Sequence, residues 1–329
     1  MYEAYFGLRE RPFDLTPNPR FLVMTARHRE ALTTLEYGLT ARTGLALLTG
    51  EAGTGKTTIV HAALQSQNVR QSRAVYLNNP ALTRDEFVEF LALGFGLSDA
   101  AATSKTRCVA ELTDVLASRH AAGTMSALVI DEAQCLPDAL LEEVRLLANI
   151  ESAAEKLLSI VLAGQPEIAE RLNQPSLRQL KQRIGLRCSL AALTAPETAA
   201  YIDARLRIAG GDGSEVFTAE AVATIHDRSR GIPRTISVIA DNALVTAFAM
   251  DQRPVDRRVV AEVCRDFDFA ASPGSGAAAS GREDEDEPLG LRSFAPGPAS
   301  TVGQRDAQAA MPAADPGPYG RVKSGFSVS

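Results

Sequence analysis

Residues 45–57 read LALLTGEAGTGKT, and this stretch decides the fold. Its apolar first half has the length of one buried strand, its second half fits the pattern GxxxxGK[ST], and helical periodicity follows. A strand, a glycine-rich loop and a helix in this order are typical of a phosphate-binding loop, in which backbone N–H groups turn inward around phosphates. The residues that we assign to nucleotide binding here are Gly50, Glu51, Ala52, Gly53, Thr54, Gly55, Lys56, Thr57 and Thr58.

Two side chains of this loop carry charge and metal chemistry. We expect Lys56 to reach the β and γ phosphates of a nucleotide, and the Thr57 hydroxyl to ligate a Mg²⁺ ion that the nucleotide also binds. The loop therefore predicts a site for a nucleoside triphosphate with Mg²⁺.

The second half of such a site is an acid at the end of another buried strand. Residues 127–132, ALVIDE, supply it. Asp131 is predicted to hold the metal through water, and Glu132 to act as the general base that activates the attacking water. The alternative is an ordinary strand that ends in solvated acids.

Three polar residues further along the chain are candidates for the same site. Gln165 follows the apolar run 159–163 and is placed to orient water, or else it is a loop amide that satisfies nearby backbone groups. Arg183 is either an arginine finger that reaches a neighbouring subunit's nucleotide or a solvated arginine. Arg234 begins a predicted helix, where the dipole disfavours a cation and a bound phosphate would explain it.

The chain alternates short apolar runs with helical stretches before Pro196 and is helical after it. This alternation predicts a parallel α/β sheet flanked by helices over 1–193 and a smaller all-helical domain over 194–269. Residues 270–329 are rich in proline and glycine and are predicted to be a disordered tail. The predicted strands are 44–49, 74–78, 127–131, 159–163 and about 186–190, and the predicted helices of the second domain are 197–209, 218–229, 234–250 and 256–267.

Composition excludes several classes of protein. The 329 residues are 45% hydrophobic and 22% charged, with a net charge of −6, which argues against a membrane bundle and a strongly basic nucleic-acid coat. The four cysteines show no metal-ligand spacing, and no signal peptide or membrane span is visible. We expect a cytoplasmic protein, with a peripheral position at the inner membrane compatible with this reading.

Taken together, these motifs resemble the AAA+ ATPases of the ExeA/GspA secretion group. The resemblance covers roughly residues 1–267 and is most specific in the opening segments 2–9, 12–13, 16–17 and 27–32. It implies ATP and Mg²⁺ as cofactors, with residues 28–35 beside the adenine. It also implies a first sensor at Gln165, a finger at Arg183 and a second sensor at Arg234.

The resemblance leaves the biological role open between classes. The leading hypothesis is an oligomeric ATPase with shared ATP sites, a switch or motor that assembles an envelope secretion, pilus or exopolysaccharide export system with a protein of that system as partner. The alternative is a DNA-binding transposition or origin-like AAA+ regulator, and a third is a nucleotide-gated scaffold without turnover. In the DNA-binding alternative, the candidate contacts to DNA phosphates are Arg171, Arg178, Arg183, Arg187, Arg205 and Arg207.

Overall fold

The computed structural model describes residues 1–14, 19–21, 23–66, 69, 72–78, 80–152 and 155–267. All of them belong to one compact unit, Met1–Gly276. The predicted tail, 270–329, lies outside the described residues. Within the described ranges, no helix combines the length and the apolarity that crossing a bilayer requires.

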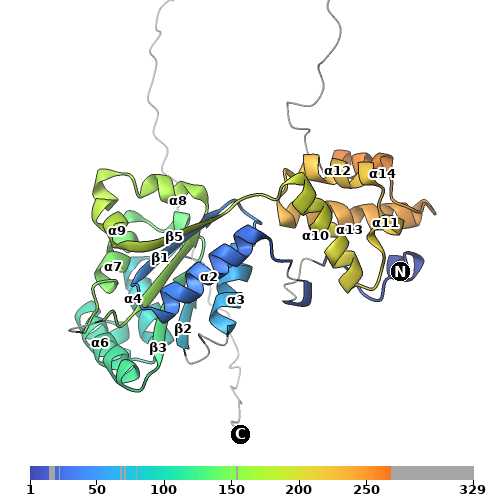
Figure 1. The fold of residues 1–329 in the computed structure, drawn as a ribbon. Coiled ribbons are helices and arrows are strands. Elements are labelled where there is room, and N and C mark those ends of the chain that lie inside the picture. The colour runs from blue at the N-terminus through green and yellow to red at the C-terminus, as the bar shows by residue number, and fades with distance from the viewer. Residues whose placement is uncertain are drawn as a thin grey trace, which may run out of the picture. The chain divides into compact units, whose positions relative to one another are not determined.

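A parallel sheet of five strands, in the order β2-β3-β4-β1-β5, forms the centre of the first part (Figure 1). Its central strands are buried on both faces, which explains their unbroken apolar sequences. The fold class predicted from the sequence is thereby confirmed. The strands are β1 (Leu45–Gly50), β2 (Ser72–Leu77), β3 (Met125–Ile130), β4 (Ser159–Gly164) and β5 (Ile184–Leu190).

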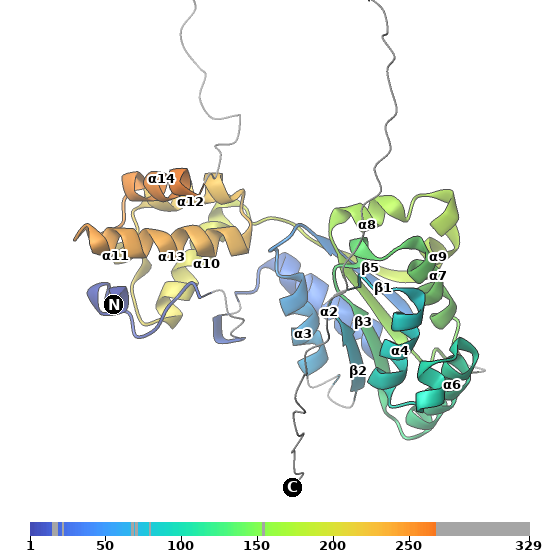
Figure 2. The ribbon, with the colours of Figure 1, turned by 180° about the vertical axis from the view of Figure 1, so that it is seen from behind.

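Helices cover both faces of the sheet (Figures 1 and 2). Successive residues of β1 show this: Leu45 and Leu47 join one apolar cluster, and Ala46 and Leu48 join the other. The first cluster includes residues of α4 (Arg84–Phe95), α5 (Asp99–Ala102), α6 (Lys105–Ala121), α7 (Asp138–Leu147), α8 (Pro166–Arg171) and α9 (Arg178–Arg183). The second includes residues of α2 (Ala26–Thr40) and α3 (Lys56–Gln65). Short 3₁₀ turns are η1 (Pro19–Phe21), η2 (Ala133–Cys135) and η3 (Pro175–Leu177).

The part after β5 is helical, as the sequence predicts. Its first helix starts at a capping box, in which the Thr194 hydroxyl accepts from the backbone N–H of Glu197 at 3.4 Å and the Glu197 carboxylate accepts from the N–H of Thr194 at 2.9 Å. The helices are α10 (Ala195–Ile208), α11 (Gly213–Val216), α12 (Ala219–Ser229), α13 (Pro233–Ala249) and α14 (Arg257–Asp266).

The opening segment, residues 1–14 and 19–21, packs with these late helices, although the sequence analysis places it in the domain over 1–193. It includes α1 (Tyr2–Tyr5), drawn in dark blue beside the orange helices in Figure 1. Phe6 and Phe13 are each 1% exposed and lie in the same apolar cluster as the cores of α10, α12, α13 and α14. The Tyr2 hydroxyl donates to Asp241 Oδ1 at 2.5 Å, which ties the segment to α13.

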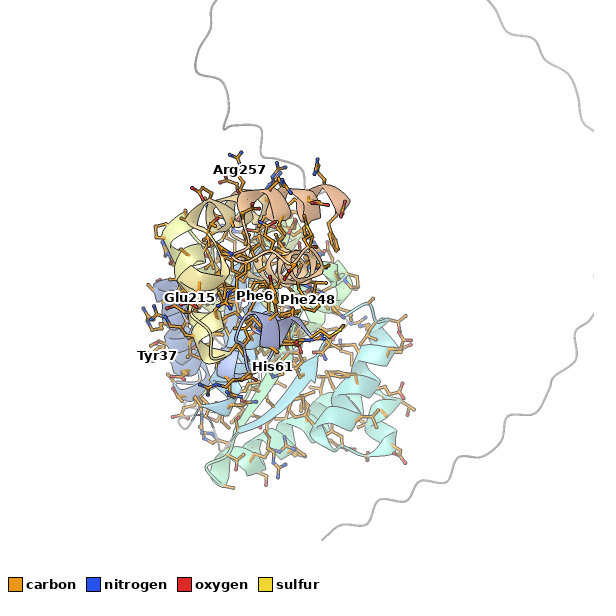
Figure 3. All side chains as sticks on the ribbon, turned by 90° about the vertical axis from the view of Figure 1, so that its right-hand side faces the viewer. Phe6, Tyr37, His61, Glu215, Phe248 and Arg257 are labelled. Atoms are coloured by element: carbon orange, nitrogen blue, oxygen red, sulfur yellow. The ribbon has the colours of Figure 1, made fainter. Side chains whose placement is uncertain are left out.

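Truncating Phe6 to alanine is expected to lower the free energy of unfolding by about 3–5 kcal/mol, because it leaves a cavity in that cluster. Met250→Ala is the control, since Met250 follows α13 in the same helical part but is 42% exposed, whereas exposed Phe248 still contacts the ring of Tyr5 (Figure 3). Chemical denaturation of the full chain measures both changes. Equal losses for the two variants would contradict the packing of the opening segment.

Candidate functional site

The loop between β1 and α3 has the backbone geometry that its glycines predict. Gly53 has φ +81° and Gly55 has φ +98°, left-handed values that residues with a Cβ rarely adopt. Gly55 caps α3, so the first N–H groups of that helix are not paired within it and face the loop. Such an arrangement binds anions, and phosphate in particular.

Lys56 is held inside this loop. Its Nζ donates to the carbonyl oxygens of Gly50 at 2.8 Å and Glu51 at 3.1 Å, and the residue is buried. Burial lowers the pKa of Lys56, and the nearby carboxylates of Glu132 and Asp131 act in the opposite direction. The loop therefore supplies a desolvated cation that phosphate oxygens would pair with.

The structure brings Thr57, in the first turn of α3, together with Asp131, at the end of β3. The Thr57 hydroxyl donates to Asp131 Oδ2 at 2.6 Å, and the Glu132 backbone N–H donates to Asp131 Oδ1 at 2.9 Å. Hydroxyl and carboxylate oxygens are ligands that Mg²⁺ accepts. Among the described residues no cluster of three or more His, Cys, Asp or Glu forms a complete metal cage. The pair therefore fits a Mg²⁺ ion whose other ligands come from nucleotide phosphates and water.

The side chain of Gln134, which has no role in the sequence-based prediction, links Glu132 to the end of β4. Glu132 has a left-handed backbone, φ +50°, and its Oε2 accepts from Gln134 Nε2 at 2.5 Å. Gln134 Oε1 in turn accepts from the backbone N–H of Gln165 at 2.9 Å. Gln134 thus joins the end of β3 to the end of β4, and the backbone of Gln165 takes part in this link. The water-orienting role of the Gln165 side chain stays a prediction.

His28, in the first turn of α2, contacts the backbone of the phosphate loop. It is 6% exposed, and its Nε2 lies 3.0 Å from the Thr54 carbonyl oxygen, to which it donates. Nδ1 therefore accepts from the Thr25 hydroxyl at 2.7 Å. The resemblance places residues 28–35 near the base, and the structure places His28 against the backbone of the phosphate loop.

A cavity of about 360 Å³ adjoins the loop and has walls from three stretches of sequence. Arg234 lines it from the first turn of α13, and its backbone N–H donates to the Gly53 carbonyl at 3.2 Å. The helical part thereby touches the phosphate loop directly. Other lining residues are Asp14, Phe21, Val23 and His28 from the opening stretch, Thr54 to Thr58 and Glu132 from the sheet side, and Leu193, Tyr201, Arg205, Pro233 and Ser237.

Arg205, one of the arginines considered as DNA phosphate contacts, is instead buried in the wall of this cavity. It is 8% exposed, and its guanidinium carbon lies 5.3 Å from the ring centres of both Phe21 and Tyr201. One Nη donates to the Ser237 hydroxyl at 3.1 Å. Helical periodicity cannot reveal this burial, because Phe21 comes from a distant part of the chain.

Arg183 lies apart from these groups. It is the last residue of α9, it is exposed, and it does not line the cavity. Within the described part of the chain its side chain makes no ion pair. Its role as a finger toward another subunit stays a prediction.

Replacing Gly53 by alanine is expected to disturb the contact between the loop and α13. The new Cβ would lie 2.8 Å from Arg234 Cβ, in addition to the cost of a left-handed residue, about 1–2 kcal/mol. Gly7→Ala is the matched control, because Gly7 has φ +72° but no atom within 4 Å of an added Cβ. Thermal unfolding should show the larger loss for Gly53→Ala, and equal losses would contradict a clash with Arg234.

Comparisons with known proteins identify relatives of this chain. Residues 40–172 match the family described as AAA domain. The chain is 43% identical over 249 residues to General secretion pathway protein A of Aeromonas hydrophila, covering 76% of this chain and 45% of that protein. It is also 31% identical over 154 residues to the Mu-like prophage FluMu DNA transposition protein B of Haemophilus influenzae. This match covers 46% of this chain and 47% of that protein. The chain thus spans about half the length of these curated relatives.

Among solved structures, Cdc6p from Pyrobaculum aerophilum is similar in fold. The TM-score is 0.60 at 16% sequence identity, and the match covers 78% of this chain and 70% of that one. At this identity the likeness concerns the fold alone. The domain match and the sequence similarity together show that residues 40–172 form an AAA domain and that the chain is related in sequence to General secretion pathway protein A.

Proposed function

We propose that the chain binds ATP with Mg²⁺ and hydrolyses it in the cavity beside the phosphate loop. The observation that carries this proposal is the meeting of Lys56, Thr57 and Asp131 at one end of the sheet. Glu132 and Arg234 line the same cavity. We further propose a nucleotide-binding domain over 1–193 and a helical lid over 194–269, with residues 1–14 packed into the lid.

Each side chain has a separate task in this proposal. Lys56 exchanges its two backbone carbonyl partners for phosphate oxygens and balances their charge. Thr57 and Asp131 hold Mg²⁺, which when bound neutralises phosphate charge that develops during the reaction. Glu132 takes a proton from the attacking water, and Arg234 and Gln165 contact the γ-phosphate side of the nucleotide.

We assign the biological role to an envelope export system. The support is the 43% identity to a general secretion pathway protein, which extends over 76% of the chain. In this proposal the chain is a cytoplasmic switch or motor, peripheral to the inner membrane, that forms oligomers through shared ATP sites and acts on a protein of the export machine. Exposed Arg183 then reaches the neighbouring subunit's nucleotide.

A DNA-dependent role is the second candidate. Similarity to a DNA transposition protein favours it, and Arg178, Arg187 and Arg207 are exposed. Phosphate contacts by such residues would make DNA binding weaken as salt rises.

Lys56→Ala is expected to abolish nucleotide binding, because it removes the buried cation of the loop. Binding of a fluorescent ATP analogue by the full chain measures this loss. Lys181→Ala, which changes a lysine outside the cavity, is the control and should bind normally. Undiminished binding by Lys56→Ala would overturn the nucleotide site.

Glu132→Gln is expected to bind ATP and to hydrolyse it at least about 100-fold more slowly, the contribution typical of a general base. Steady-state phosphate release measures the rate, and Glu89→Gln on the exposed face of α4 is the matched control. Normal turnover by Glu132→Gln would remove the proposed base.

Arg183→Ala is expected to lower turnover by roughly 10³-fold, the effect of an arginine finger, and turnover of the wild type should rise with protein concentration. Mixing Arg183→Ala with Lys56→Ala subunits should restore activity, since each supplies what the other lacks. Arg178→Ala, in the same helix, is the control. Absence of both concentration dependence and rescue would make Arg183 a surface residue.

Duplex DNA distinguishes the two candidate roles. The export role predicts turnover that DNA does not change. Stimulation by DNA that weakens between about 50 and 200 mM salt would favour the DNA-dependent role instead.

A further inference from the structure

A tyrosine outside the predicted site contacts the carboxylate at its centre. The Tyr76 hydroxyl, from β2, donates to Asp131 Oδ2 at 2.9 Å. The same oxygen accepts from the Thr57 hydroxyl at 2.6 Å. Asp131 is 5% exposed, so these donors, with the Glu132 N–H on Oδ1, fix the orientation of a buried carboxylate.

The backbone of β2 holds Asp131 from the same side. The Asp131 N–H donates to the Leu77 carbonyl at 2.9 Å, which continues the β2-β3 ladder by one residue. Tyr76 is therefore rigidly placed relative to Asp131 by the sheet itself. A carboxylate oxygen can only accept, so the Tyr76 phenol is the donor in this contact.

One face of α3 completes this arrangement. Thr57 and His61 are four residues apart on α3 and therefore project from the same face of the helix. The His61 ring stacks on the Tyr76 ring, with centroids 4.9 Å apart and an angle of 10° between the planes. His61, labelled in Figure 3, thus packs against Tyr76. It lies one helical turn from Thr57, the other side chain that donates to Asp131.

We propose that Tyr76 is a positioning residue for the Mg²⁺ site, which orients Asp131 through its hydroxyl and is itself held in place by the His61 ring. The proposal rests on the proposed function, since it requires that Asp131 hold Mg²⁺ with a bound nucleotide. Partners of this kind, which bind a metal ligand and not the metal, typically change metal affinity about 10–100-fold when removed.

Tyr76→Phe tests the proposal because it removes one hydroxyl and keeps the ring. Binding of a fluorescent ADP analogue to the full chain is measured against free Mg²⁺ concentration. We expect the Mg²⁺ midpoint to rise about tenfold, while binding in EDTA, which depends on the loop and Lys56, does not change. Mn²⁺ binding in the presence of ADP is a second measurement that needs no turnover. The electron paramagnetic resonance signal of free Mn²⁺ falls as the ion binds, and Tyr76→Phe should need more protein for the same fall.

Two further variants separate positioning from general stability. Tyr37→Phe removes the hydroxyl of a tyrosine that is 59% exposed and should leave the midpoint unchanged (Figure 3). His61→Ala should raise the midpoint by about threefold, the size expected of a stacked aromatic pair, and His61→Phe should restore it. His61 is exposed, so these variants also serve if Tyr76→Phe does not fold.

The outcomes are distinct. If the affinity of the wild-type protein for ADP does not depend on Mg²⁺, the proposed function is overturned, and this inference with it. A wild type that responds to Mg²⁺, with the same midpoint in Tyr76→Phe, would overturn the inference alone. A lower melting temperature for Tyr76→Phe without a shifted midpoint would show that the hydroxyl only stabilises the fold.

Discussion

The hydrogen bond from the Thr57 hydroxyl to Asp131 is the contact on which the site depends. It joins the first turn of α3 to the end of β3, although β4 lies between β1 and β3 in the sheet. Parallel strands place their carboxyl ends at one edge, so residues 74 positions apart meet there without any dedicated connection. A buried carboxylate needs such donors, because leaving it unpaired would cost several kcal/mol. The geometry of the candidate site and the stability of this edge thus rest on the same few atoms.

The helical part shares the cavity with the sheet and is therefore coupled to what occupies it. Arg234 contacts the phosphate loop through its backbone, and Arg205 lies among aromatic rings in the same wall. The opening segment is packed into this helical part, so Asp14 and Phe21 reach the cavity beside residues that follow them by nearly two hundred positions. A bound nucleotide would touch all three stretches of sequence, and occupancy of the cavity would bias how they are arranged.

Sequence reasoning reached the features that local rules determine. The spacing of residues 50–57 and the acids after a buried strand predicted where Lys56, Thr57, Asp131 and Glu132 would meet. It did not find Gln134, whose link from Glu132 to Gln165 depends on the left-handed backbone of Glu132. Nor did it find Tyr76, which reads as an ordinary strand residue until β2 is paired with β3. It named Arg205 as a candidate DNA phosphate contact because two of the rings that cover it, those of Phe13 and Phe21, belong to a remote segment.

The packing of the opening segment also sets an order of events during synthesis. Tyr2, Phe6 and Phe13 leave the ribosome long before residues 195–264, which bury them, have been made. At 5–20 residues per second this interval is on the order of ten to forty seconds. The sheet and its helices, whose apolar contacts lie between residues 31 and 190, are complete in sequence just before the first of these late residues is made. The growing chain therefore carries an uncovered aromatic segment until the helices that bury it have been made.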